Sequence, residues 1–325
     1  MRFVIYGAGA IGGLMGGCLY QSGHRVELIA RGRHLAAIQD GGLVVERQDQ
    51  RVVLPVPAVA GPDALDWDEP AVVVLAVKSQ DTEAALDALE AVAPPDTVVV
   101  CAQNGVANER RALRRFANTY GLCVMCPATH LEPGVVVGHS VPITGLMDLG
   151  RYPGGVDDTA AAVAAALVES TFQSVVRPDI MRWKYRKLLT NLPNAVEALC
   201  GAAGRGSEVA VRAVAEAEVV LAAAGIDVAT AEEDTERRGT LLQTPPLGGR
   251  QWGGGSSWQS VTRGTGTVEA DFLNGEIALL GRLFGLPAPV NGFLQHRAGD
   301  AARAGRRPGD VTPEQLLAEL DSGAA

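Results

Sequence analysis

A glycine-rich turn near the first residue constrains the fold more than any other feature of this sequence. The run Gly7-Ala8-Gly9-Ala10-Ile11-Gly12 directly follows an apolar segment, residues 3–6, and opens a segment with helical spacing, residues 11–21. In this strand–turn–helix context the first glycine allows the tight turn, the second lets the backbone approach a pyrophosphate, and the third allows close helix–strand packing. Free N–H groups and the helix dipole then favour an anion. We therefore expect a dinucleotide-binding domain at the N-terminus.

The rest of the first half fits a doubly wound α/β sheet. Short apolar runs bounded by turn residues predict buried strands, and helical segments at 11–21 and 82–92 alternate with them, as in βαβ units around a parallel sheet. The strands are expected at 3–6, 26–30, 52–56, 71–77 and 97–102. Three later runs, at 122–127, 135–138 and 141–146, lack long helical spacers. We expect them to form an antiparallel extension of the sheet.

The second half has the pattern of an all-helical domain. Long Ala-, Leu- and Glu-rich segments with helical spacing lie at 158–173, 180–200, 206–224, 268–284 and 292–304. We place the domain boundary after Asp179, because Pro178 cannot continue a helix and the aspartate can cap the next one. This gives a Rossmann-type domain over 1–179 and a helical domain over 180–325. Pro193 predicts a kink or break, and the Gly- and Pro-rich stretch 243–257 predicts a loop.

Composition excludes several classes of function. The 325 residues carry a net charge of -9, so there is no large basic surface for nucleic acid. The five scattered cysteines do not suit a disulfide framework, and no apolar run reaches the roughly 20 residues of a membrane span. We expect a soluble cytoplasmic protein. The sequence leaves the oligomeric state open, a homodimer included.

The residues at the end of the second expected strand indicate whether the cofactor is NAD or NADP. An NAD enzyme usually has a carboxylate there for the ribose 2′-hydroxyl, whereas an arginine suits a 2′-phosphate. Here Ala30 and Arg31 occupy the strand end, and Arg33 adds a second donor nearby. Glu27 argues weakly for NAD but lies inside the strand. The pattern favours NADPH; the alternative is that both arginines are solvated surface residues.

Two polar residues follow later strands of the expected sheet. Lys78 comes after the run 71–77, and Asn104 follows 97–102 within Gln103-Asn104-Gly105. Ligands of open α/β sheets bind outside the carboxyl ends of the strands, so both are candidates for contact with the cofactor. Either residue alone could equally be a solvated loop residue.

A polar stripe on a predicted helix is the strongest signal in the second half. Lys187, Asn191 and Asn194 are spaced i, i+4, i+7, so a helix brings a lysine and two amides onto one face. Lys184 lies one turn earlier and is the rival candidate for any role given to Lys187. The stripe could also be the solvent face of an amphipathic helix, since leucines mark the adjoining side. Further on, Ser257 leaves the glycine-rich stretch, and Glu269 opens the next helix, where a carboxylate often serves only as a dipole partner.

Taken in order, these motifs resemble the ketopantoate reductase family from residue 1 to about residue 295. The resemblance implies a Rossmann domain joined to a helical domain with the active site between them, and NADPH-dependent reduction of a 2-oxo acid. If the roles of the family's residues apply to this chain, Lys187 is the general acid, and Glu269 binds a substrate hydroxyl or orients the lysine. Lys78 and Asn104 lie near the nicotinamide and its ribose, and Asn104, Asn191, Asn194 and Ser257 contact substrate.

The sequence departs from that family at the expected substrate pocket. Members with ketopantoate activity carry a second asparagine four residues after the first, where this chain has Ala195 with Asn194 beside it. The stretch 248–255 is also longer than the family core. Another branched or larger 2-oxo acid is therefore an open alternative to 2-dehydropantoate. So are a 3-hydroxyacid or opine-type dehydrogenase and a non-catalytic NADPH-binding sensor.

No metal site is expected. Cys123 and Cys126 form a lone Cys-x-x-Cys inside an apolar run, without a second pair to complete a zinc site. His130, Glu132 and His139 flank a Pro-Gly turn and lack the spacing of a metal knuckle. We interpret both cysteines as core residues.

Overall fold

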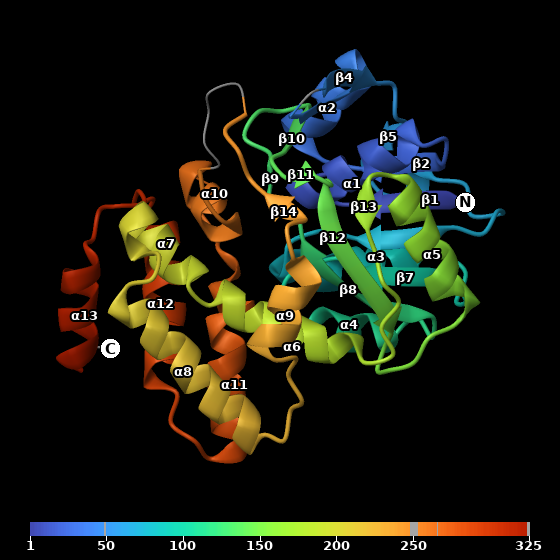
Figure 1. Cartoon of the computed structure of the whole chain (residues 1–325). Helices are drawn as coiled ribbons and strands as arrows, with labels where there is room; N and C mark the ends of the chain where they lie inside the picture. Colours follow the sequence, from blue (N-terminus) through green and yellow to red (C-terminus); the bar gives the residue numbers. More distant parts are fainter. Residues whose placement is uncertain (49, 248–252, 265, 324–325) are drawn as a thin grey trace. The chain divides into compact units, whose positions relative to one another are not determined.

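The computed structural model describes residues 1–48, 50–247, 253–264 and 266–323 (Figure 1). The described chain forms two compact units. The first comprises Met1–Gln103, Ala107–Lys184 and the described part of Glu232–Trp252. The second comprises Asn104–Val106, Tyr185–Ala231 and the described part of Gly253–Ala325. Within the described ranges, no helix combines the length and the apolar character that crossing a bilayer would require.

The first unit is built on an eight-stranded sheet in the order β13-β12-β8-β7-β6-β1-β2-β5. In the run β8-β7-β6-β1-β2-β5 each strand is parallel to the next, and this is the strand order of a Rossmann fold. Val72–Val74 pair in register with Val98–Val100, as expected of strands buried on both faces. The strands are β1 (Arg2–Tyr6), β2 (Arg25–Ile29), β5 (Ala58–Val59), β6 (Val72–Leu75), β7 (Val98–Cys101), β8 (Thr119–Met125), β12 (Gly145–Arg151) and β13 (Phe172–Gln173).

The expected antiparallel extension is smaller than the sequence pattern suggests. Only β12 runs antiparallel to its neighbour β8; β8 itself is parallel to β7, because the short helix α4 (Asn108–Leu113) provides a crossover between them. The run 135–138 belongs to a separate four-stranded sheet, in the order β4-β3-β10-β9. That sheet consists of β3 (Leu43–Arg47), β4 (Gln50–Leu54), β9 (Ala128–Thr129) and β10 (Val135–Gly138). Its strand β10 packs on the first helix, since a Cβ on Gly13 would lie 2.8 Å from Val136.

Helices cover both faces of the main sheet. One apolar cluster includes Leu14 and Leu19 of α1 (Ala10–Gln21) and Val163 and Leu167 of α5 (Asp158–Glu169). A second cluster on the other face includes residues of α3 (Thr82–Glu90) and α4. The unit also contains α2 (Gly32–Gly41) and most of α9 (Ala231–Arg238), and strand β14 (Leu242–Gln243) pairs with β11 (Val141–Pro142). The doubly wound architecture predicted from the sequence is therefore confirmed.

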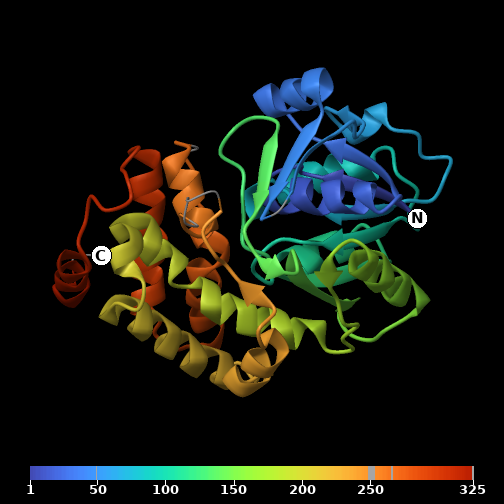
Figure 2. The same cartoon turned by 45° about the horizontal axis from the view of Figure 1, so that its top comes forward.

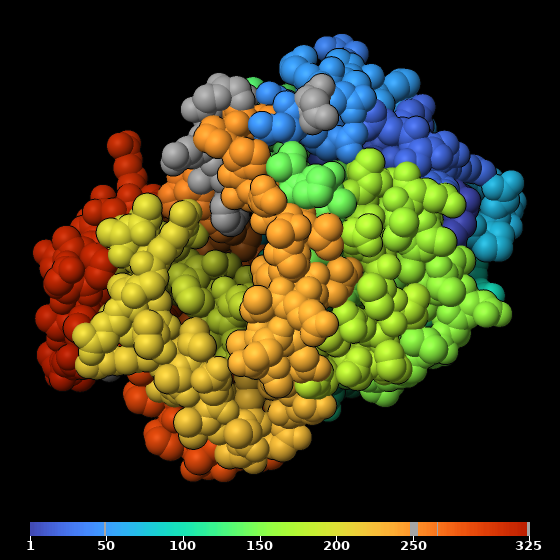
Figure 3. Space-filling view, in the orientation of Figure 1, coloured from blue at the N-terminus to red at the C-terminus, as the bar shows by residue number. Residues whose placement is uncertain are grey.

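The second unit is helical. Helix α6 (Ile180–Asn191) ends just before Pro193 and α7 (Asn194–Cys200) follows it, which is the break that the proline predicts (Figure 2). Helices α11 and α12 contact each other and α8, whose outer side is exposed in the space-filling view (yellow in Figure 3). The other helices are α8 (Glu208–Ala223), α10 (Ser256–Thr262), α11 (Asn274–Phe284), α12 (Pro289–Arg303) and α13 (Pro313–Asp321). Their core contains mainly Ala, Val and Leu side chains.

The division into units differs from a single cut after Asp179. Helix α6 belongs to the first unit as far as Lys184, and the segment that begins at Glu232 returns to the first unit. The return depends on short contacts such as the antiparallel pairing of β14 with β11. A two-residue strand has no periodicity that sequence reasoning could detect.

Candidate active site

Two glycines of the first turn are required by packing inside the protein. Gly7 has φ +107°, and a Cβ there would lie 2.7 Å from the nitrogen of Val77. At Gly12 a Cβ would lie 2.1 Å from the carbonyl oxygen of Gly7. Gly9 differs from both, because a Cβ at this position would meet no atom of the described residues within 4 Å apart from its own chain neighbours. The open space at Gly9 is what a ligand lying against the backbone would need.

The N-terminus of α1 presents donors to this space. The N–H groups of Gly7 and Ala8 donate to the carbonyl of Ile29 at 3.1 and 3.2 Å and hold the turn against β2. Gly9 is the N-cap and no side chain caps the helix, so the N–H groups of its first turn, which begins at Ala10 and Ile11, lack intrahelical acceptors. The first turn contains no acidic residue. This arrangement fits a pyrophosphate.

The turn is also held by a histidine that sequence reasoning missed. The Nδ1 of His34 accepts the N–H of Gly134 at 2.9 Å, so Nε2 carries the proton and donates to the carbonyl of Ala8 at 2.7 Å. Gly134 is one hundred residues away in the sequence. No local signal could have identified this contact.

Arg31 lies at the expected strand end and is accessible. Its side chain is 83% exposed and donates to Asp81 at 2.7 Å. Such an exposed ion pair contributes little, so the guanidinium can exchange the carboxylate for a phosphate. Glu27, the counter-argument for NAD, is buried and held by Arg2 at 3.0 Å. Burial also raises the pKa of Tyr6, just before the turn, and this side chain stays uncharged.

Lys78 directly precedes a buried polar network that joins two strand ends. Asn108 donates to the hydroxyl of Ser79 at 3.1 Å and accepts from Thr82 at 2.9 Å, and Gln103 donates to Thr82 at 3.2 Å. The network fixes the loop after β6 to the loop after β7. Lys78 and Asn104 are each next in sequence to a residue of this network, Ser79 and Gln103.

In the second unit a hydrogen bond joins two of the residues named from the sequence. The Nδ2 of Asn191 donates to the Oδ1 of Asn104 at 3.0 Å. Next to it, Gly105 has φ +80°, and a Cβ there would lie 2.9 Å from the carbonyl oxygen of Phe272. Asn104, the α6 residue Asn191 and the segment that begins at Glu269 thus converge, and Lys187 is one helical turn before Asn191. Glu269 is buried and Lys187 is half-buried.

Ser257 and Asn194 lie on two helices that contact each other, α10 and α7. Ser257 is 2% exposed, and its Oγ has no hydrogen-bond partner among the described residues. The Oδ1 of Asn194 lies 3.0 Å from the position that a Cβ on Gly255 would take. A buried hydroxyl without a partner is costly unless a ligand satisfies it, so Ser257 is suited to binding one.

Lys184 has a different environment from Lys187. Its side chain is 2% exposed, pairs with the buried carboxylate of Glu109, and donates to the carbonyls of Gln103 at 3.0 Å and Leu122 at 3.3 Å. An ammonium held by three acceptors inside the protein is not free to approach a substrate carbonyl. Between the two lysines, burial therefore favours Lys187 as the reactive one.

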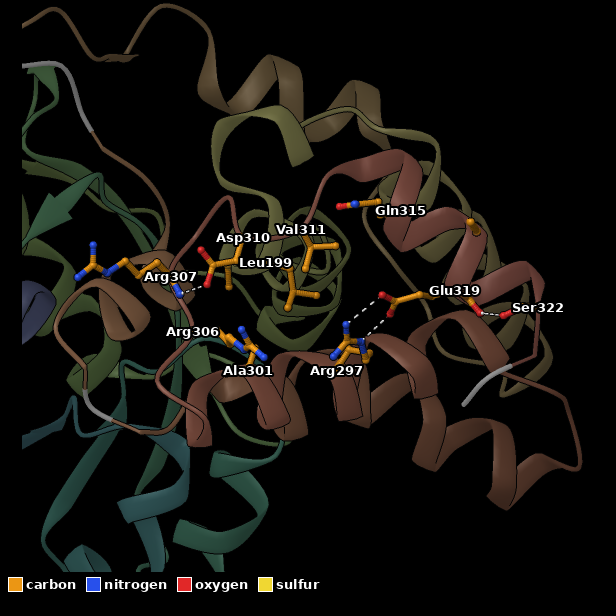
Figure 4. A pocket seen from close by; sticks show the side chains of 12 residues that line it. Leu199, Arg297, Ala301, Arg306, Arg307, Asp310, Val311, Gln315, Glu319 and Ser322 are labelled. Atoms are coloured by element: carbon orange, nitrogen blue, oxygen red, sulfur yellow. Dashed lines mark hydrogen bonds and ion pairs between the residues drawn. The ribbon is translucent and has the colours of Figure 1, made fainter.

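The second unit also contains a cavity of about 640 Å³ that is separate from these residues (Figure 4). It lies among α7, α12, α13 and the segment between the last two. Within it, Arg297 forms a two-pronged pair with Glu319 at 2.8 and 3.2 Å, so part of its charge is already neutralised. None of the residues that the sequence singled out lines this cavity.

The sequence signals that we discounted have ordinary partners. His139 contacts the hydroxyl of Thr129 through Nε2 at 2.9 Å, and His130 contacts the carbonyl of Val135 through Nδ1 at 3.0 Å. Cys123 is buried, and burial raises the pKa of the Cys126 thiol. In the described ranges, no three His, Cys, Asp or Glu side chains are grouped so that they could hold a metal ion.

Family models and curated relatives that are similar to this chain all point to the same family. The model of the family "Ketopantoate reductase PanE/ApbA" matches residues 3–154, and that of its C-terminal domain matches residues 179–299. A 2-dehydropantoate 2-reductase of Pyrococcus horikoshii is 31% identical over 302 residues, covering 90% of this chain and 95% of the relative. The corresponding protein of Halobacterium salinarum is 29% identical over 326 residues, covering 95% of this chain and 100% of the relative.

Two solved structures have a similar fold. A PanE/ApbA family ketopantoate reductase from Ralstonia eutropha JMP134 superimposes with a TM-score of 0.76 at 26% identity, over 94% of this chain and 99% of that chain. A D-mandelate dehydrogenase, in a ternary structure with NADH and anilino(oxo)acetate, gives a TM-score of 0.76 at 24% identity, over 93% and 99%.

Proposed function

Because this chain belongs to the ketopantoate reductase family of NADP-dependent oxidoreductases, we propose that it uses NADPH to reduce a 2-oxo acid, 2-dehydropantoate or a related branched acid, to the 2-hydroxy acid. The observation that carries the proposal is the hydrogen bond between Asn104 and Asn191. It joins Asn104, in the loop after β7, to Asn191, which lies on the helix that also carries Lys187.

The residues of the first turn fit a dinucleotide. Gly7 to Gly12 would hold the pyrophosphate through backbone N–H groups, Arg31 would bind the 2′-phosphate, and Lys78 would bind near the nicotinamide ribose. When bound, NADPH supplies the hydride to the carbonyl carbon of the substrate. The open space at Gly9 and the uncapped N-terminus of α1 support this assignment without reference to any relative.

Lys187 is the general acid of the proposed reaction. As the carbonyl carbon accepts a hydride, negative charge develops on the carbonyl oxygen; an ammonium beside it stabilises that charge and supplies the proton. Glu269 either orients this lysine or binds a hydroxyl of the substrate. The neighbouring lysine, Lys184, is committed to its buried pair with Glu109.

The amides and the serine position the substrate. Asn104, Asn191 and Asn194 offer donors and acceptors to a carboxylate and a carbonyl, and Ser257 offers a buried hydroxyl that has no partner among the described residues. Ala195, where established members have an asparagine, is 2% exposed in the apolar core of the second unit. Alanine cannot supply the polar contact that an asparagine at this position would offer, which favours a substrate with an apolar substituent.

The test is consumption of NADPH by the purified chain with a panel of oxo acids. The panel contains 2-dehydropantoate, an unhydroxylated branched 2-oxo acid, an aryl 2-oxo acid and a 3-oxo acid, each with NADPH and with NADH. Turnover of 2-oxo acids with preference for NADPH supports the proposal. Turnover of the 3-oxo acid alone would indicate a 3-hydroxyacid dehydrogenase, and tight NADPH binding without any turnover would indicate a sensor.

A further inference from the structure

We propose that Glu197 is a positioning residue for Ser257: its carboxylate fixes the backbone that precedes this serine and thereby sets where the hydroxyl meets the substrate. The inference rests on the proposed function. Glu197 lies on α7, one turn after Asn194 and outside the motifs by which the chain was recognised. Its side chain is 7% exposed, so its charge must be satisfied inside the protein.

Both oxygens of this carboxylate have specific partners. Oε2 accepts the backbone N–H of Gly255 at 2.9 Å, and Oε1 accepts the Nε of Arg205 at 2.5 Å. Arg205 also donates to the carbonyl of Gly253 at 3.4 Å. It is held close to α7 because the preceding turn packs tightly there: a Cβ on Gly204 would lie 2.8 Å from the carbonyl oxygen of Val196. The pair thus connects α7 to the residues just before α10 at two points, Gly253 and Gly255.

Gly253, Gly254 and Gly255 are packed too tightly to be an arbitrary linker. A Cβ on Gly253 or on Gly254 would lie 2.6 or 2.7 Å from the indole of Trp258, so the ring covers both residues. A Cβ on Gly255 would lie 3.1 Å from the Oε2 of Glu197. Glycine at these positions lets the backbone approach the indole and the carboxylate. These contacts fix the backbone at the point where α10 begins.

The orientation of Ser257 depends on this backbone, because no hydrogen bond from the described residues holds its side chain. Its Oγ has no hydrogen-bond partner among the described residues, although the side chain is almost fully buried. The position of the hydroxyl is therefore determined by the backbone at Ser257. This residue comes two positions after Gly255, whose N–H donates to Glu197. An error of about 1 Å in such a contact can reduce catalysis by about 10²-fold. A carboxylate that fixes Gly255 consequently acts on the reaction through Ser257.

The structure offers a matched control in Glu216. This residue of α8 also accepts backbone N–H groups within the second unit, from Val290 at 2.9 Å and Asn291 at 2.8 Å. It holds the start of α12 and touches neither α10 nor the segment before it in any contact that the structure describes. Glu216→Gln therefore weakens a carboxylate–backbone tether of the same kind without an effect on Ser257.

The experiment is a double-mutant cycle on the holoenzyme with Glu197→Gln and Ser257→Ala. We expect Glu197→Gln to raise KM for the 2-oxo acid about tenfold, with the Kd for NADPH unchanged, and the double variant to be no worse than Ser257→Ala alone. Glu216→Gln should leave KM unchanged. If the two effects on kcat/KM multiply instead, Glu197 does not act through Ser257 and the proposal is overturned.

A second measurement does not depend on turnover. Hydrogen exchange at the Gly255 amide should be at least tenfold faster in Glu197→Ala than in the wild-type protein and unchanged in Glu216→Gln. Equal exchange in the wild type and Glu197→Ala overturns the tether. If the wild-type chain turns over no oxo acid while the exchange difference is present, the proposed function fails and the tether stands.

Discussion

The buried pair between Lys184 and Glu109 leads to a prediction about stability that separates this lysine from Lys187. Replacing Lys184 by methionine keeps the length and much of the apolar packing of the side chain but removes the charge. Glu109, which is 0% exposed, is then left inside the protein without a counter-ion. The carbonyls of Gln103 and Leu122 lose their shared donor as well.

The size of the effect follows from these contacts. Breaking a buried ion pair by removing one partner destabilises a protein by about 3–5 kcal/mol. For a unit of 150–250 residues, 1 kcal/mol shifts Tm by about 2–4 °C, so Lys184→Met should lower the Tm of the first unit by roughly 6–20 °C. Lys187→Met, which removes a half-buried ammonium from the same helix, should change Tm by no more than about 2 °C.

Differential scanning calorimetry of both variants and of Lys184→Met/Glu109→Gln checks the reasoning. The double variant removes both charges, and we expect it to recover most of the lost stability, since the large penalty belongs to the unpaired carboxylate. A Tm for Lys184→Met within about 2 °C of the wild type would refute the buried pair. An unchanged Tm combined with loss of turnover would also refute the buried pair. That result would assign the role of general acid to Lys184.

Four further variants test the site. Lys187→Ala should lower kcat by about 10²-fold or more while retaining NADPH binding, as measured by stopped-flow and fluorescence titration; an unchanged kcat would exclude it as the acid. Arg31→Ala should raise the Kd for NADPH far more than that for NADH, and an equal rise would contradict a phosphate contact. Gly9→Val should abolish NADPH binding with little change in Tm, because a Cβ added there would meet no atom of the described residues within 4 Å apart from its own chain neighbours. Gly12→Ala should instead lower Tm strongly, because its Cβ would clash with the carbonyl of Gly7. A similar Tm for the two variants would count against the roles assigned to the glycines of this turn.

The features that the sequence predicted well are those with local signals. The Rossmann turn was identified because steric demands on Gly7 and Gly12 require glycine at fixed spacing, and the break between α6 and α7 because proline cannot continue a helix. Two missed helices also carried signals. Thr312 and Gln315 form a capping box at α13, and α9 begins with acidic residues and ends with basic ones.

The features that could not be predicted depend on contacts between distant residues. The contact of His34 with Ala8 and Gly134 and the pairing of β14 with β11 join segments that share no periodicity or motif. The crossover helix α4 has only six residues, too few for a helical repeat to be distinguished from a loop. Such features are determined by packing of the complete fold.

The two lysines of α6 show why a motif locates a helix more reliably than it assigns roles on it. Lys184 and Lys187 are three residues apart, so on an α-helix their side chains project about 60° apart, and both fall on the stripe that the sequence reveals. Lys184 is distinguished by its partners on other elements, the buried carboxylate of Glu109 and the carbonyls of Gln103 and Leu122. Because an ion pair of this kind opposes rotation of the helix about its axis, the buried lysine also limits the directions in which Lys187 and Asn191 project. The residue that sequence reasoning treated as a rival is thus better understood as the anchor of the helix that carries the proposed acid.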